Sequence, residues 1–280
     1  MTNNIHFNCN RTKKHYLISV LSFIFLFALL SQLKTVSAET FVLAVQPILS
    51  KERTLKFYQP LAAFLSKATG HDIKIYATSN FVAYWEELRK NKKYDLALDA
   101  AHFADYRVKN LKYTILAKIN DTVSFSLITN EDVNYFDADE LIGQRIATLA
   151  SPSFGGIRLL SMYPNISRQP VVIGKNNFEE TLKQLKSNKV SAALVPTPLI
   201  NGDSSVNTML VTEPIPHMAI SASNRISKET KDKIRNALIK ASSTKEGQAL
   251  FTKLNLTGFE KANNSLYDGY GSLLKDVWGY

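Results

Sequence analysis

The sequence predicts an α/β protein with two lobes, each a mostly parallel sheet flanked by helices, joined by two crossover segments. Short apolar runs of strand length alternate with segments of helical periodicity in the first part of the chain, and the same alternation returns after residue 138. Between the two blocks, and again after the second, extended runs interrupt the alternation. We interpret these interruptions as the places where the chain passes from one lobe to the other.

The first 38 residues have the pattern of a secretory signal peptide. Three basic residues precede an apolar run at residues 17–30, and the small residues Val-Ser-Ala end at Ala38. This order is typical of leaders that are removed on export. We therefore expect cleavage after Ala38 and a periplasmic protein. An uncleaved membrane anchor is the alternative, for which the apolar run is short.

The mature chain of about 242 residues is moderately basic and is expected to contain no disulfides. The leader carries four of the 34 basic residues and none of the 24 acidic ones, and the only cysteine, Cys9, precedes its apolar run. The surplus of positive charge either keeps the surface soluble or favours anionic ligands. The basic residues are scattered and form no nucleic-acid-reading motif, so we expect no nucleic-acid partner. We expect a monomer that binds a small molecule.

The first block supplies three strands and three helices. Its first helix ends at Gly70, and the cap-like residues 78–80 precede its second helix. Two extended runs, at 113–119 and 123–129, follow the block. We expect strands at 41–45, 73–77 and 94–98, and helices at 51–68, 81–90 and 101–108.

The second block repeats this plan, and the chain then returns to the first lobe. After a short helical segment at 138–141, we expect strands at 145–149, 170–173 and 192–195, one helix after the first of these strands and another at 177–187. Extended pieces at 209–212 and 219–221 lead to helices at 228–242 and 245–254. The expected domains are therefore 1–38 for the signal peptide, 39–125 and 211–280 for the first lobe, and 126–210 for the second.

Four stretches of the mature chain carry a family resemblance. Two of them, "FYQPLAAFLSKATGHDIKIYATSNF" and "YWEELRKNKKYDLALDAAHFADY", lie in the first block, and "ATLASPSFGG" and "FEETLKQLKSNKVSAALVP" lie in the second. Together they resemble the phosphate/phosphite/phosphonate-type substrate-binding proteins of ABC importers. The resemblance implies the type II periplasmic binding protein fold, capture of a small anion by hinge closure, and delivery to an ABC permease. A ligand-binding module that reports to a membrane sensor is the alternative.

The first candidate ligand site is the turn between the strand at 145–149 and the helix that follows. The first amides of a helix lack internal partners, and its dipole favours an anion there. The resemblance places the family's anion turn at the same position, with Phe154 and Gly155 where two hydroxyls are usual. A helix cap and an ordinary turn are the alternative role of these residues. The candidates are Ser151, Ser153, Phe154, Gly155 and Gly156.

The first lobe offers a second set of candidates. Thr78, Ser79 and Asn80 stand at a strand end and a helix start, where they could contact the ligand or cap the helix. Aromatic side chains could line the cleft or pack in the core. Core packing is expected for Tyr84, whereas Tyr58, Phe81 and Phe103 remain open between the two.

Asp99 and His102 flank the Ala100-Ala101 pair, which the resemblance aligns with a usual Gly-Pro. At the mouth of a cleft, Asp99 would repel a phosphonate unless it met an amine or a cation, and His102 could be a polar ligand contact. The spacing of Asp99, His102 and Asp105 also permits a metal interpretation. No second cluster completes such a site, so we assign no metal and no cofactor. His217, near the second crossing, is expected to pack at the hinge.

The sequence does not favour an enzyme. It contains no nucleophile elbow, His-Glu-x-x-His, Walker loop or dinucleotide-binding glycine motif. The adjacent acids Glu86-Glu87 and Glu179-Glu180 are interpreted as solvated helix faces, because neighbouring residues point in different directions around a helix. We therefore expect a binding protein without catalytic residues.

Overall fold

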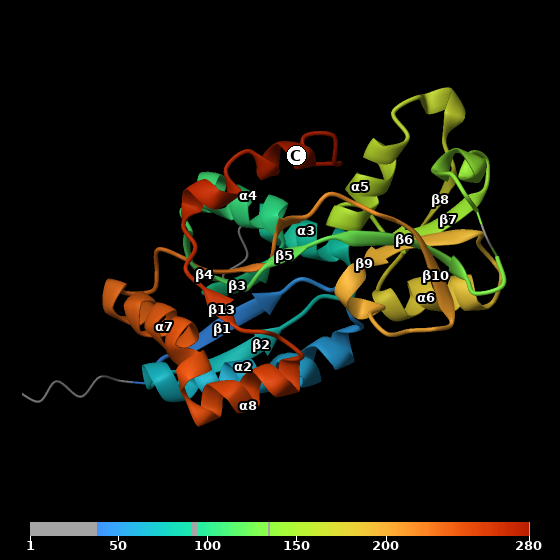
Figure 1. The fold of residues 1–280 in the computed structure, drawn as a ribbon. Helices are drawn as coiled ribbons and strands as arrows, with labels where there is room; N and C mark the ends of the chain where they lie inside the picture. The colour runs from blue at the N-terminus through green and yellow to red at the C-terminus, as the bar shows by residue number, and fades with distance from the viewer. Residues whose placement is uncertain (1–37, 91–93, 134, 280) are drawn as a thin grey trace, which may run out of the picture. The chain divides into compact units, whose positions relative to one another are not determined.

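The computed structural model describes residues 38–90, 94–133 and 135–279, and Glu39–Tyr280 form one compact unit. The predicted signal peptide lies outside the described residues, apart from Ala38. Within the described ranges, no helix is both long and apolar enough to cross a bilayer. The strands form two large sheets and one small one (Figure 1).

The sheet of the first lobe has six strands in the order β13-β4-β12-β3-β1-β2. Its central strands pair in parallel, β1 with both β2 and β3, whereas β12 and β13 run antiparallel to their neighbours. The strands are β1 (Thr40–Val45), β2 (Asp72–Tyr76), β3 (Leu96–Asp99), β4 (Thr114–Ile119), β12 (Ala219–Ala222) and β13 (Phe259–Glu260).

The sheet of the second lobe has five strands in the order β10-β6-β9-β7-β8. Here β7 pairs in parallel with β8 and β9, whereas β6 is antiparallel to β9 and β10. The strands are β6 (Phe125–Asn130), β7 (Arg145–Leu149), β8 (Val171–Lys175), β9 (Ala192–Pro196) and β10 (Val206–Val211).

Both sheets are mixed, but most strands of each sheet run in one direction, as expected, and β6, β12 and β13 run in the other. The helix-linked strands are parallel because each crossover helix returns the chain to the same end of the sheet. Two strands that enter their sheet from the other lobe, β6 and β12, run in the opposite direction. A two-stranded sheet of β5 (Thr122–Val123) and β11 (Ile215–Pro216) joins the two crossing segments.

The helices begin and end where the local sequence provides caps. The Ser50 side chain accepts a hydrogen bond from the Arg53 amide at the start of the first helix, and Gly70, with φ of 77°, ends it in the left-handed conformation that glycine allows. The α-helices are α2 (Lys51–Thr69), α3 (Phe81–Arg89), α4 (Ala101–Leu111), α5 (Phe154–Met162), α6 (Phe178–Lys186), α7 (Lys228–Lys240) and α8 (Lys245–Leu254). The predicted 138–141 segment is the 3-10 helix η1 (Ala138–Leu141). Helix α7 packs against α2 and β4 of the first lobe, and α8 packs against α2.

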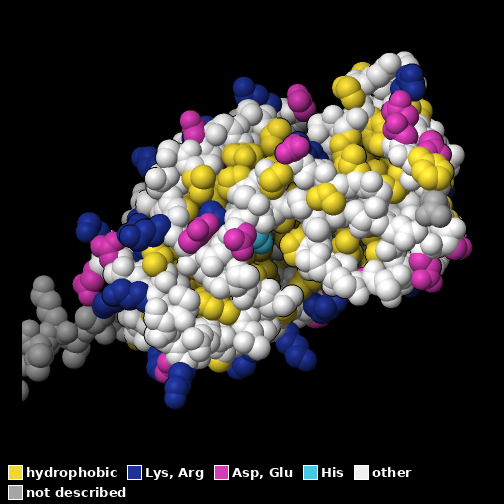
Figure 2. All heavy atoms as spheres, in the orientation of Figure 1, with side chains coloured by type: hydrophobic (Ala, Val, Ile, Leu, Met, Phe, Trp, Pro, Cys, Tyr) yellow, Lys and Arg dark blue, Asp and Glu magenta, His cyan; other side chains and the backbone are white. Residues whose placement is uncertain are grey.

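The segment after α8 was not assigned from the sequence. After β13 it forms the short 3-10 helices η5 (Asn264–Tyr267) and η6 (Tyr270–Leu274), which pack against α4. Tyr267 and Leu274 are fully buried there, and the Tyr267 hydroxyl donates to the His217 carbonyl at 2.7 Å. Apolar side chains remain visible over this segment in the space-filling view (Figure 2). The C-terminal segment is therefore an integral part of the first lobe.

Candidate ligand-binding site between the lobes

The second-lobe turn is built around a helix cap. The Ser153 hydroxyl accepts from the Gly156 amide at 2.9 Å and donates to the Leu149 carbonyl at 2.7 Å, and its side chain is buried. This hydroxyl is therefore fully engaged within the second lobe. Within the described part of the chain, the amides of Phe154 and Gly155 have no hydrogen-bond acceptor, as expected for the free donors at a helix start.

The two glycines allow the turn to fold tightly. A Cβ atom on Gly156 would lie 2.8 Å from both the Leu149 carbonyl oxygen and the Ser151 amide nitrogen, which no side chain tolerates without a backbone shift. A Cβ on Gly155 would lie 3.1 Å from the Thr148 hydroxyl. Ser151, in contrast, is exposed at the edge of the turn. It is thus the hydroxyl of this turn that solvent or a ligand can reach.

The Phe154 ring lies at the contact between the two lobes. Its ring stacks on Phe125 of β6 at 5.5 Å between centroids, and it meets the His102 ring edge-on at 5.4 Å. Because His102 belongs to α4 of the first lobe, the start of α5 packs directly against the start of α4. The two lobes therefore contact each other at the predicted turn.

The polar candidates of the first lobe also form a cap. The Asn80 side chain accepts from the Ala83 amide at 2.9 Å, and the Thr78 hydroxyl donates to the Asn80 carbonyl at 3.0 Å. Thr78 is buried, whereas Ser79 is exposed. Phe81 is buried and stacks on Phe103, so both rings lie in the core beneath this helix start. Ser79 and Asn80 are the members of this group that solvent reaches.

His102 bridges the lobes from a buried position. Its side chain is fully buried, and Nε2 lies 2.8 Å from the Pro152 carbonyl oxygen of the second-lobe turn. A carbonyl only accepts, so Nε2 carries the hydrogen, and Nδ1 is left as a buried acceptor without a partner. Burial lowers the pKa of His102 from 6.5 to about 4, against the opposing effect of the Pro152 carbonyl. The ring is therefore neutral near pH 7.

Asp99 lies inside the first lobe rather than at a cleft mouth. Its carboxylate is fully buried and accepts from Nε of Arg107 at 2.5 Å and from the Tyr84 hydroxyl. Arg107 Nη2 also donates to the Tyr84 hydroxyl at 3.0 Å. Burial and then the Asp99 charge raise the pKa of Tyr84 well above its usual value. The negative charge of Asp99, which was expected to repel an anion, is therefore compensated by Arg107 inside the first lobe.

The remaining candidates make their contacts within the first lobe. Asp105 pairs with Lys109 and accepts from the Gly271 amide, so it points away from the partners of Asp99 and His102. In the described ranges, no group of three or more His, Cys, Asp or Glu residues is arranged to hold a metal ion. Tyr58 packs partly buried against the first-lobe core, where burial raises its pKa to about 12. Tyr84 is buried, as predicted.

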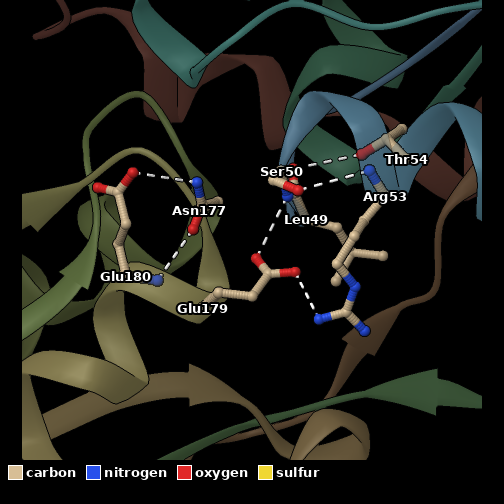
Figure 3. Close-up of polar contacts among 7 residues, drawn as sticks. All are labelled: Leu49, Ser50, Arg53, Thr54, Asn177, Glu179 and Glu180. Carbon is tan, nitrogen blue, oxygen red and sulfur yellow. Dashed lines mark hydrogen bonds and ion pairs between the residues drawn. The ribbon is translucent and has the colours of Figure 1, made fainter.

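A second interlobe contact was missed by the sequence analysis. The Phe178 amide, at the start of α6, donates to the Ile48 carbonyl at 2.8 Å. The Glu179 carboxylate accepts from the Ser50 amide at 3.2 Å and pairs with the Arg53 guanidinium at 2.7 Å (Figure 3). These partners are 126 residues or more apart in sequence, so no local pattern could have paired them.

The comparison with protein families agrees with this architecture. The family model of ABC transporter, phosphonate, periplasmic substrate-binding proteins matches residues 43–267. The chain belongs to this family. No curated protein is similar enough to the chain to count as a match.

Solved structures share the fold of this family member at low sequence identity. A binding protein component of an ABC phosphonate transporter from Pseudomonas aeruginosa aligns with a TM-score of 0.70 at 16% identity, over 82% of this chain and 84% of the other. PhnD1 from Prochlorococcus marinus, in complex with methylphosphonate, gives 0.73 at 14%, over 84% and 97%. A Xanthomonas citri protein bound to ATP gives 0.65 at 11%, over 85% and 99%. The predicted two-lobed type II binding protein fold is confirmed.

The shared topology also identifies which helix starts correspond between the lobes of this family member. In each lobe, a central strand is followed by a helix, an outer strand and a second helix, so α2 corresponds to α5 and α3 to α6. Ser50 is therefore the counterpart of Ser153, and Asn177 that of Asn80, in capping the matching helix. The Asn-Phe pair at the start of both α3 and α6 is the sequence feature that could have revealed this correspondence.

Proposed function

We propose that this protein captures a small anion of the phosphonate or phosphate type between its two lobes and delivers it to the permease of an ABC importer. The observation that carries the proposal is the meeting of the 151–156 turn with the start of α4, through His102 and Pro152. Family membership and the moderately basic mature chain support an anionic ligand. The protein would act as a monomer in the periplasm, after removal of residues 1–38, and would catalyse no reaction.

In this proposal, the reachable donors bind the anion and the caps hold those donors in place. The Ser151 hydroxyl and the amides of Phe154 and Gly155 would contact it from the second lobe, and Ser79 from the first. Ser153 and Asn80 would act through the helix starts that they cap. Each hydrogen bond to a charged ligand contributes roughly 1.5 to 3 kcal/mol, or one to two decades in affinity. In this proposal, the remaining donors would compensate for the absence of two usual hydroxyls.

We propose that the hinge lies at the small β5–β11 sheet, with lobe boundaries near residues 125 and 210. A ligand that contacts both lobes binds the closed form more tightly than the open form and thereby shifts the population toward closure. Two short strands are compatible with such a motion. The two crossing segments keep the lobes attached, and the few pairs between β5 and β11 offer little resistance to bending. The closed form would then be the one that the permease recognises.

The proposal can be tested by thermal unfolding of the protein purified from the periplasm, in a phosphate-free buffer. We expect at least one member of a panel of phosphate, phosphite, methylphosphonate and 2-aminoethylphosphonate to raise the melting temperature, because a ligand selective for the folded state stabilises it. Sulfonates, carboxylates and divalent metal ions serve as comparison compounds. Stabilisation by metal ions alone would contradict an anion site.

Two serine variants separate ligand contact from helix capping. Ser151→Ala should leave the unliganded melting temperature unchanged and weaken anion binding about tenfold or more, through one lost charge-assisted hydrogen bond. Ser153→Ala should lower the unliganded stability by about 1 kcal/mol, because the cap of α5 is lost. If Ser151→Ala binds the stabilising anion as tightly as the wild type, the assigned donor is wrong.

A further inference from the structure

The starts of α2 and α6, which belong to different lobes, are held together by the carboxylate of Glu179. In Figure 3 the Glu179 side chain extends from α6 toward Ser50 and Arg53 of the first lobe. One carboxylate oxygen accepts from the Ser50 amide at 3.2 Å, and the other pairs with Arg53 Nη1 at 2.7 Å. Beside it, the Phe178 amide donates to the Ile48 carbonyl at 2.8 Å. Three interactions thus join the lobes at one place.

We propose that Glu179 is a latch that holds the two lobes closed when no ligand is bound. This inference uses one part of the proposed function, namely that these two lobes close over a ligand. The contacts of Glu179 join protein groups of the two lobes directly and need no ligand atom, so they favour the closed form whether or not a ligand is bound. The Glu179–Arg53 latch would then set how much of the protein is closed before a ligand arrives.

The position of the carboxylate explains why it suits this role. Ser50 caps α2, so the Glu179 carboxylate lies at the positive end of that helix dipole, where an anion is favoured. Arg53, in the first turn of the same helix, adds a formal positive charge. The carboxylate is 30% exposed and Arg53 is 61% exposed, so neither group is locked into the core. Water can therefore replace these contacts when the lobes part.

The neighbouring residue Glu180 provides a matched comparison. It sits on the same first turn of α6 but turns toward its own lobe, where it accepts from the Asn177 side-chain amide at 3.2 Å and from the Asn176 amide at 3.4 Å. Among the described residues, its hydrogen-bond partners all belong to the second lobe. Both residues are negatively charged and lie in the first turn of α6, where they stabilise the helix through its dipole, so replacing either one should affect that helix similarly. Only Glu179 should change the lobe-to-lobe equilibrium.

The test measures the distance between the lobes in the unliganded protein. Spin labels on Lys56→Cys of α2 and Lys183→Cys of α6, both exposed positions, report separation of the two helices by pulsed electron paramagnetic resonance. The only cysteine of the sequence, Cys9, lies in the predicted signal peptide, so the exported protein carries no other thiol to be labelled. Glu179→Gln should reduce the ratio of closed to open protein by about three- to tenfold, in keeping with an exposed ion pair plus a lost charged hydrogen bond. Glu180→Gln should leave the distribution unchanged.

A second variant tests the same contact from the other lobe. Arg53→Met, which changes an exposed side chain, should also lower the closed population, and adding Glu179→Gln should lower it less than the sum of the two separate effects. Equal distributions for Glu179→Gln and Glu180→Gln would overturn the latch. So would a larger closed population in Glu179→Gln, since the carboxylate would then oppose closure.

The same variants distinguish this proposal from the proposed function. If methylphosphonate or phosphate binds, Glu179→Gln should weaken its affinity, by no more than about the three- to tenfold change in the closed-to-open ratio, because less of the protein is in the binding-competent form. Tighter binding by this variant would overturn the latch and indicate that the carboxylate competes with the ligand. If no anion in the panel binds, the proposed function fails, while the distances in the unliganded protein still decide whether Glu179 holds the lobes together.

Discussion

Acidification should destabilise this protein through His102. The ring is fully buried between the lobes, against Phe103, Phe154 and the Pro152 carbonyl, and burial lowers its pKa from 6.5 to about 4. In the unfolded chain the ring takes up a proton near pH 6.5, whereas the folded ring takes one up only near pH 4. Between these values the unfolded state binds more protons, so stability falls as the pH falls. A shift of this size corresponds to about 3 kcal/mol.

Urea unfolding of the wild type and of His102→Gln near pH 7.5 and near pH 4.5 would measure this effect. Gln retains a donor for the Pro152 carbonyl but does not titrate. The wild type should lose about 2 to 3 kcal/mol more stability than the variant across this interval. His217, whose pKa is also lowered to about 4 by burial and then by Lys118, is present in both proteins and cancels in the comparison. Equal losses in the two proteins would refute the assignment to His102.

Two further substitutions test the packing on either side of the site. Arg107→Met should cost about 3 to 5 kcal/mol in urea unfolding, because it leaves the buried Asp99 carboxylate without its cation; a loss below about 1 kcal/mol would show that the pair is not needed. Gly156→Ala should cost about 1 to 3 kcal/mol and weaken anion binding, because its Cβ would press on backbone atoms of the turn. Unchanged stability and affinity would mean that the turn is not as tight as described.

The sequence predicted the helix-linked half of each sheet and not the direction of the remaining strands. Alternating apolar runs and caps such as Ser50 and Gly70 are local signals, and they locate α2, β2 and α3 to within a few residues. The run at 219–222 is apolar in any orientation, so its antiparallel pairing with β3 and β4 is set by the path of the crossing. The C-terminal turns carry no periodic pattern, because they are too short to have one.

The sequence predicts a candidate site at the turn formed by residues 151–156, but it does not divide the roles of the residues there. A serine before a helix serves equally well as a cap or as a ligand donor, and only the surrounding contacts distinguish the engaged Ser153 from the exposed Ser151. Arg107 of α4 lies eight residues after Asp99, at the end of β3, and could have been considered as its partner. The Glu179 contacts depend on how the lobes meet, and no spacing in the sequence encodes them.

The central claim is that one anion is bound by both lobes at the turn formed by residues 151–156. The most direct measurement is a crystal structure of the exported protein grown with methylphosphonate. We predict the phosphonate group within hydrogen-bond distance of Ser151 and the Phe154 amide, with Ser79 of the first lobe on its other side. A phosphonate bound to one lobe alone, or at a surface away from this turn, would contradict the account.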